Sequence, residues 1–283
     1  MNASWAAVVG DPVSHSLSPS IFRLFSRMEG RPLRYYALTL RPEDLKGALA
    51  SAKGRPWVGW SVTAPLKVEV LALVDSADET ARDVGAANLI RFHQGRCLGY
   101  NTDVEGFLKP LSRLGFPLLG KRAAVLGAGG AARAACAALK RRGVGNLWIL
   151  SRNSRKARAL ADAFSARSGG LSGNQALGAL GEADLVVNAT SAGMDGVSSP
   201  LPAGTRFKRG ALAYDLSYRP RRTPFLSAAG DAGVETLGGL GMLVAQAAAA
   251  WKILFGRTLA EEVLERTENE LMGRLSYESS PGA

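Results

Sequence analysis

The sequence has few cysteines and no long apolar run, and each shortage excludes a class of protein. Its two cysteines, Cys97 and Cys136, lie far apart and form no CxxC pair, so we expect neither a disulfide framework nor a metal site. No stretch approaches the roughly 18 consecutive apolar residues of a membrane helix, and residues 1–11 hold no basic segment followed by a long apolar one. These absences predict a cytoplasmic protein with no membrane partner.

Basic residues outnumber acidic ones and give a net charge of +11. A basic surface attracts phosphate groups at long range, so a nucleic-acid partner has to be considered. The lysines and arginines gather, however, in short segments with no interleaved aromatic residues and no nucleic-acid motif, namely residues 139–143, 151–158 and 218–222. We interpret the excess charge as a solvated surface and expect no nucleic-acid partner.

Strand-like and helix-like segments alternate along a chain of 283 residues, which is long enough for two domains. This alternation is the βαβ pattern of a mostly parallel sheet, so we expect an α/β protein. The first series has expected strands at 5–10, 34–40 and 58–63, expected helices at 18–28 and 42–53, and an expected hairpin over 86–103 that turns at 93–95. The second has expected strands at 122–129, 147–152, 183–191 and 211–217, a surface loop at 165–174, helices at 239–256 and 259–275, and an end, 276–283, that should fray.

A glycine motif marks the start of the second series. Gly127, Gly129 and Ala132 satisfy G-x-G-x-x-[GA] directly after an expected strand and at the start of an expected helix. The first glycine permits the tight turn, the second lets the backbone approach a pyrophosphate, and the small third residue allows close packing of helix on strand. The segment predicts a dinucleotide site; the alternative is a glycine turn without a ligand.

The end of the next strand indicates which dinucleotide binds. An NAD site usually has an Asp or Glu there, whereas this chain has Arg152, with Lys156 and Arg155 close behind. Cations at this place suit a 2′-phosphate, because they form charge-assisted hydrogen bonds with it. We therefore expect NADP rather than NAD, the alternative being that these are solvated loop charges.

Hydride transfer to or from a nicotinamide also needs a group that carries a proton. Lys67 follows an expected strand, as do Ser16 and Ser18, whose hydroxyls could bind a small anion at a helix start. Ligands of doubly wound sheets bind outside the carboxyl ends of the strands, so these loops should face one crevice, where Asp103 would complete a charged pair. The alternatives are a helix-capping Ser18, a solvated Lys67 and a helix-capping Asp103.

Ordered blocks along nearly the whole chain resemble the shikimate dehydrogenase family. They are SLSPS (16–20), SVTAPLK (61–67), GAANL (85–89), NTDVEG (101–106), GAGGAA (127–132), NATSAGM (188–194) and GLGMLVAQ (239–246). The resemblance implies a substrate domain at 1–103, a Rossmann-like NADP-binding domain at 104–236, and C-terminal helices at 237–283 that fold back on the first domain.

The resemblance also implies an activity, the reversible NADP-dependent reduction of 3-dehydroshikimate to shikimate, a step towards chorismate and the aromatic amino acids. Lys67 and Asp103 would then be the catalytic pair that flanks the reacting oxygen. The residues expected to bind substrate are Ser16, Ser18, Thr63, Asn88, Tyr218 and Gln246. The residues expected to bind the cofactor are Gly127, Ala128, Gly129, Gly130, Ala131, Ala132, Arg152, Lys156, Gly239 and Met242.

One departure from the family pattern concerns substrate choice. The family block usually reads N-V-T-x-P-x-K, but its first position here is Ser61, which offers no amide. Losing a hydrogen-bonding group at a polyhydroxylated ligand changes discrimination between substrates. A quinate/shikimate dehydrogenase or a divergent paralogue is therefore the second hypothesis, a catalytically silent NADP-binding regulatory protein is the third, and the chain is expected to be a monomer or a homodimer.

Overall fold

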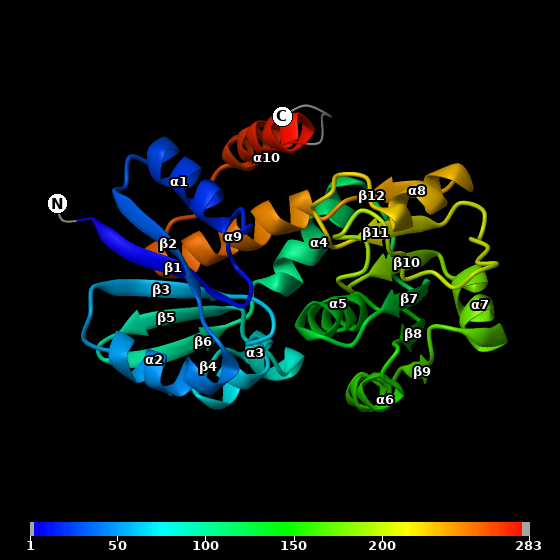
Figure 1. Ribbon diagram of the computed structural model, residues 1–283, viewed down its shortest axis with the longest axis horizontal. Coiled ribbons are helices and arrows are strands. Elements are labelled where there is room, and N and C mark those ends of the chain that lie inside the picture. Colours follow the sequence, from blue (N-terminus) through cyan, green and yellow to red (C-terminus); the bar gives the residue numbers. More distant parts are fainter. Residues whose placement is uncertain (1–2, 279–283) are drawn as a thin grey trace. The chain divides into compact units, whose positions relative to one another are not determined.

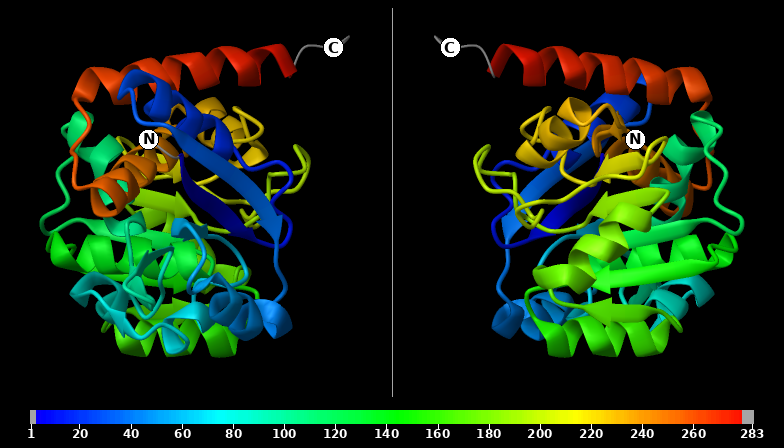
Figure 2. Two further views of the ribbon diagram at one scale, coloured as in Figure 1. Left: turned by 90° about the vertical axis from the view of Figure 1, so that its left-hand side faces the viewer. Right: turned by 90° about the vertical axis from the view of Figure 1, so that its right-hand side faces the viewer.

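Two six-stranded sheets organise the chain in a computed structural model that describes residues 3–278 (Figures 1 and 2). The chain divides into two units, which we describe separately. The first unit runs to Gly106 and includes Val244–Asn269, and the second comprises Phe107–Leu243 and the chain from Glu270 onward. The expected boundaries at 103/104 and 236/237 stay predictions. Within the described residues, no helix is long and apolar enough to cross a membrane.

The first unit has a mixed sheet with the strand order β2-β1-β3-β5-β6-β4. The neighbours of β1 are parallel to it, whereas β5 is antiparallel to both β3 and β6. Its strands are β1 (Ser4–Gly10), β2 (Leu33–Thr39), β3 (Trp57–Val62), β4 (Ser76–Ala77), β5 (Leu89–His93) and β6 (Arg96–Tyr100). Its helices include α1 (Ser18–Met28), η1 (Pro42–Asp44), α2 (Leu45–Ala52), η2 (Glu69–Ala72) and α3 (Glu79–Val84).

The expected hairpin over 86–103 is present as β5 and β6. Gln94 and Gly95 connect the strands, and both have positive φ, at 50° and 73°. A two-residue hairpin loop with left-handed central residues matches the twist of its strands, and glycine adopts that conformation without steric cost. The turn signal at 93–95 therefore predicted the connection correctly.

The second unit has an all-parallel sheet with the order β12-β11-β10-β7-β8-β9. β10 and β11 are buried along their whole length, as expected for parallel strands covered by helices on both faces. Its strands are β7 (Arg122–Leu126), β8 (Asn146–Leu150), β9 (Arg167–Gly169), β10 (Leu185–Asn188), β11 (Leu212–Asp215) and β12 (Glu235–Leu237). The helices between β7 and β12 are α5 (Gly130–Arg141), α6 (Ser154–Ala163), α7 (Gly173–Glu182) and α8 (Pro224–Asp231).

Three helices contain or adjoin the junctions between the units: α4 (Asp103–Arg113), α9 (Leu240–Phe255) and α10 (Glu261–Glu278). α9 and α10 match the helices expected at 239–256 and 259–275. α10 also takes in the first residues of the segment 276–283 that was expected to fray, while 279–283 lie outside the described residues.

Local expectations were wrong at two places. The segment 165–174 is not a surface loop throughout, because Arg167–Gly169 forms edge strand β9 beside β8 and α7 begins at Gly173. The segment lacks the β-branched residues by which strands are identified, so its pairing comes from the neighbouring strand. Ser18 is not the N-cap of α1: it is the first helical residue, and its N–H donates to Ser16 Oγ at 3.2 Å.

Candidate active site

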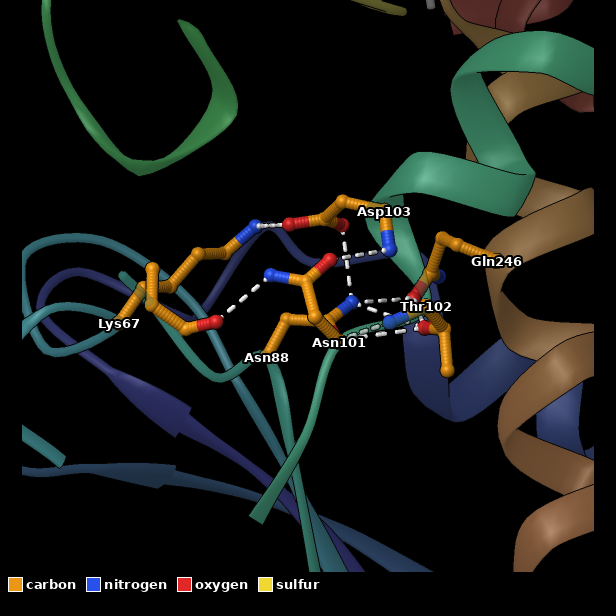
Figure 3. Close-up of polar contacts among 7 residues, drawn as sticks. Lys67, Asn88, Asn101, Thr102, Asp103 and Gln246 are labelled. Atoms are coloured by element: carbon orange, nitrogen blue, oxygen red, sulfur yellow. Dashed lines mark hydrogen bonds and ion pairs between the residues drawn. The ribbon is translucent and has the colours of Figure 1, made fainter. Parts of the chain in front are cut away.

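An ion pair between Lys67 and Asp103 forms the centre of a polar cluster in the first unit (Figure 3). Lys67 Nζ lies 2.7 Å from Asp103 Oδ2, and the two side chains are 17% and 4% exposed. Lys67 lies in the turn between β3 and η2, and Asp103 is the first residue of α4. Neither side chain is a solvated surface charge, and the pair presents an amine that is fixed in position by a carboxylate.

Asn88 fixes the other carboxylate oxygen of Asp103. Its Nδ2 donates to Asp103 Oδ1 at 2.8 Å and to Thr102 Oγ1 at 2.9 Å, while its Oδ1 accepts the Thr102 N–H at 2.7 Å. Gln246 Oε1, on α9, lies 3.4 Å from Asn88 Nδ2 and 3.5 Å from Thr102 Oγ1. Because both of its oxygens have partners, the Asp103 carboxylate has one defined orientation (Figure 3).

The β5–β6 hairpin explains why these residues meet. Asn88 directly precedes β5 and Thr102 follows β6, so the antiparallel pairing brings the two ends of the hairpin together, and the Asn88 N–H donates to Tyr100 O at 3.0 Å. The Ala87 N–H donates to Lys67 O at 2.8 Å, which anchors the lysine backbone to the same hairpin. Asn101 Oδ1 accepts the Asp103 N–H at 3.0 Å, which satisfies the first N–H of α4.

Several hydroxyl groups lie close to Ser18 in the same unit. Tyr35 OH donates to Ser61 Oγ at 2.7 Å, and the Ser18 side chain also lies beside the phenol. Burial raises the pKa of Tyr35 above its usual range, so the phenol stays protonated. Phe22 stacks on the Tyr35 ring at 4.3 Å between centroids. Sequence reasoning missed Tyr35, whose only signal is an aromatic residue within a strand.

The remaining expected substrate residues lie on loops that follow strands. Thr63 begins the loop between β3 and Lys67, and its N–H donates to Val9 O at 2.9 Å. Tyr218 lies in the loop after β11, half-buried, in the second unit.

Two of the residues expected to bind the cofactor lie in the second unit as well. The Gly239 N–H donates to Ser217 O at 3.1 Å, and Met242 lies in the first turn of α9.

The glycine turn of the second unit has the features of a phosphate cradle. Gly127 has a φ of +112°, and a Cβ there would come within 2.9 Å of Ala189 O. Gly129 is the N-cap of α5 and offers no side-chain acceptor, and a Cβ added to it would meet nothing within 4 Å. The first N–H groups of α5 therefore have no acceptor from a capping side chain, which suits a bound anion. Ala132 is fully buried, as close helix packing requires.

Exposed cations follow the neighbouring strand β8. Arg152 and Lys156 are both exposed, and Asn153 caps α6 by accepting the Lys156 N–H at 2.9 Å. Residues 151–156 contain no carboxylate that would repel a phosphate. Together with the glycine turn, this segment fits a dinucleotide that carries a 2′-phosphate.

Models of two families match the chain. The model described as shikimate dehydrogenase substrate binding domain covers residues 8–90, and the one described as shikimate / quinate 5-dehydrogenase covers residues 111–199. The NADP(+) shikimate dehydrogenase of Moorella thermoacetica is 40% identical over 95% of this chain and 94% of its own. That of Citrifermentans bemidjiense is 39% identical over 98% and 97% of the two chains.

Solved structures resemble the fold over nearly its whole length. Shikimate 5-dehydrogenase from Thermus thermophilus, in complex with NADP(H) and shikimate, has a TM-score of 0.85 and 37% identity, and the match covers 94% of this chain and 99% of that one. The ligand-free 5-ketofructose reductase of a Gluconobacter species has a TM-score of 0.83 and 30% identity, with 96% and 99% covered. The fold thus occurs with more than one named substrate.

Proposed function

The chain belongs to the shikimate dehydrogenase family, and on that premise we propose that it is an NADP-dependent oxidoreductase that interconverts 3-dehydroshikimate and shikimate. The observation that carries the proposal is the Lys67–Asp103 ion pair at 2.7 Å, held in place by Asn88. Family membership supports the choice of substrate, and the geometry of the ion pair supports Lys67 as the group that moves the proton. A cytoplasmic location and a monomeric or homodimeric state stay predictions.

Lys67 and Asp103 act as the catalytic pair in this proposal. When bound, NADPH supplies the hydride that reduces the ring ketone. The Lys67 ammonium donates a proton to the ketone oxygen as the hydride reaches the carbon, so that a hydroxyl forms; in the reverse direction the amine accepts that proton. Asp103 orients the lysine and balances its charge, because its carboxylate lies within hydrogen-bond distance of Nζ.

The substrate's other groups are assigned to the remaining residues of the site. The hydroxyls of Ser16 and Ser18 bind the substrate carboxylate, and Tyr218 stays a predicted substrate residue of the second unit. Asn88, Gln246 and Thr63 hydrogen-bond the ring hydroxyls. Support comes from the Tyr35 phenol, which donates a hydrogen bond to Ser61 Oγ and lies beside the Ser18 side chain.

The cofactor is assigned to the second unit. The N–H groups at Gly127 to Ala132 hold the pyrophosphate, Arg152 and Lys156 hold the 2′-phosphate, and Gly239 and Met242 lie near the nicotinamide. Support comes from the open N-terminus of α5 and from the absence of a carboxylate among residues 151–156.

Initial rates with two substrates and two cofactors test the proposal. Shikimate and quinate are each paired with NADP and NAD, and the absorbance of reduced nicotinamide is followed. The proposal expects the highest kcat/KM for shikimate with NADP. A preference for quinate would contradict the assigned substrate, and silence in all four reactions with intact NADP binding would contradict catalysis itself.

A further inference from the structure

Asp215 is a buried carboxylate that takes no part in the proposed chemistry. It is the last residue of β11 in the second unit, and none of its surface is exposed. Its hydrogen-bond partners are neutral: Thr223 Oγ1 donates to Oδ2 at 2.6 Å, Asn188 Nδ2 donates to Oδ2 at 3.1 Å, and the Ser217 N–H donates to Oδ1 at 2.9 Å. Burial raises the pKa of this carboxyl, so keeping it in the interior has a cost.

The donors around Asp215 are themselves fixed. Thr223 Oγ1 accepts the Leu226 N–H at 3.2 Å as the N-cap of α8, so its own proton is directed at Asp215. Asn188 Nδ2 donates its second hydrogen to Ala192 O at 3.1 Å. Thr223 therefore connects the carboxylate to α8, and Asn188 connects it to the loop that follows β10.

The loop after β10 leads from this network to the glycine turn. Asn188 Oδ1 accepts both the Thr190 N–H at 3.0 Å and the Thr190 hydroxyl at 2.7 Å, which fixes the backbone at Ala189 and Thr190. That backbone is the neighbour of Gly127, where an added Cβ would come within 2.9 Å of Ala189 O. The position of the glycine turn thus depends on a segment held by Asn188, and Asn188 is held by Asp215.

The loop after β11 leads to Gly239. Asp215 Oδ1 holds the Ser217 N–H, and Ser217 O in turn accepts the Gly239 N–H at 3.1 Å. A Cβ on Gly239 would overlap the Leu216 carbonyl oxygen, so the glycine lies tightly against this loop. The Asp215 carboxylate is therefore connected to both segments that the proposed function assigns to the cofactor, the glycine turn at Gly127 and the segment at Gly239.

We propose that Asp215 is a positioning residue for cofactor binding: it joins the loops after β10 and β11 and so fixes the spacing between Gly127 and Gly239. The inference rests on the proposed function for the identity of the cofactor. A buried charge with a purely structural role would change stability alone, whereas a positioning residue changes the affinity for NADP as well.

Two carboxylates of the same unit provide the test and its matched control. Asp184 directly precedes β10, at the opposite end of that strand from Asn188, where it accepts the Arg122 N–H at 2.9 Å and pairs with Lys208. Asp215→Asn keeps the size but turns an acceptor into a donor. We expect it to weaken NADP binding at least about tenfold, the scale of losing a hydrogen bond to a charged group. Asp184→Asn should leave NADP binding within about twofold, because its partners Arg122 and Lys208 belong to neither of the segments that hold Gly127 and Gly239.

Variants at Thr223 keep the proposal testable if Asp215→Asn fails to fold. Thr223→Val removes the donor to Asp215 with little change in size, and Thr223→Ser restores it. The expected result is weaker NADP binding in the valine variant and near-normal binding in the serine variant. Binding is measured by titration with NADP alone, well below each variant's Tm, and KM for NADP and kcat are measured in parallel.

The outcomes separate this inference from the proposed function. NADP affinity that is unchanged in Asp215→Asn, or equally weakened in Asp184→Asn, would overturn the positioning role, as would a serine variant that binds no better than the valine one. Failure of the unaltered protein to oxidise shikimate with NADP would instead overturn the proposed activity, and the binding titration does not depend on turnover.

Discussion

Removing the amine of Lys67 is the sharpest test of the catalytic assignment. Lys67→Ala deletes the nitrogen that lies 2.7 Å from Asp103 Oδ2 and leaves the backbone bond from Ala87 in place. Loss of a general acid–base group lowers turnover by about 10²- to 10⁴-fold. At about 1.36 kcal/mol for each factor of ten, the activation barrier should rise by about 3 to 5 kcal/mol.

Lys67→Ala should also lower the free energy of unfolding, and the burial of the ion pair indicates by how much. Removing one partner of a fully buried ion pair costs about 3 to 5 kcal/mol, because the other charge is left uncompensated. Lys67 is 17% exposed, and Asp103 keeps its bond from Asn88, so we expect a loss of about 1 to 3 kcal/mol in the free energy of unfolding. Adding Asp103→Asn should recover part of that stability but none of the turnover.

Lys53 provides a matched control on the same unit. Lys53 Nζ pairs with Asp75 Oδ2 at 2.9 Å, but the two side chains are 36% and 33% exposed. Lys53→Ala should lower stability much less than Lys67→Ala does and leave kcat unchanged. The assay is the initial rate of shikimate oxidation, with unfolding measured in urea. A Lys67→Ala enzyme that retained more than about a tenth of wild-type kcat would refute the assignment of Lys67 as proton carrier.

Further predictions concern the cofactor, the glycine turn and acid stability. Arg152→Ala should raise KM for NADP about tenfold or more and leave KM for NAD nearly unchanged, because a charge-assisted hydrogen bond to the 2′-phosphate is lost. Steady-state kinetics with both cofactors check this, and an equal rise in the two KM values would contradict it. Gly127→Ala forces a φ of +112° on a residue with a Cβ and should lower stability by about 1 to 3 kcal/mol while weakening NADP binding, which urea unfolding and NADP titration check. The Cys97 N–H and the Lys53 ammonium lower the pKa of Asp75, so its contribution to stability is present above the ordinary aspartate pKa and is lost as the pH falls through the lower folded value. As the pH is lowered through that range, the Tm of Asp75→Asn should therefore fall less than the Tm of the wild type. An equal fall in the two Tm values would contradict this role.

Much of the fold follows from local pattern. The alternation of strand-like and helix-like segments predicted the α/β class, and the Gly95 turn predicted the β5–β6 hairpin, because these signals depend only on neighbours in the chain. Arg167–Gly169 shows where this kind of reasoning ends. As an edge strand of three residues, it forms because β8 offers free backbone groups, and no property of its own side chains predicts it.

Part of the site was also predictable, for a related reason. Lys67 follows an expected strand and Asp103 ends the expected hairpin, and ligands of doubly wound sheets bind at the carboxyl ends of strands, so the sequence predicted a charged pair. The bond that holds the second oxygen of Asp103 was not predictable, because Asn88 reaches that oxygen only when the two ends of the hairpin close on one another. The same is true of Asp215, whose partners Asn188 and Thr223 lie on other elements.

Ser61 shows why some substrate contacts need the strand order and register. In sequence, its replacement of the family's asparagine only removes an amide. In the sheet, β1 separates β2 from β3, and Tyr35 on β2 is paired with Ala6, which in turn is paired with Gly59. Tyr35 and Ser61 therefore lie on the same face of the sheet, and the Tyr35 hydroxyl reaches Ser61 on the far strand. If this bond takes the place of the missing amide, Tyr35→Phe should raise KM for shikimate by several-fold, on the scale of one neutral hydrogen bond. Tyr36→Phe is the matched control, because Tyr36 packs instead against Trp5 and Trp57. Equal KM values for the two variants would show that Ser61 acts without Tyr35.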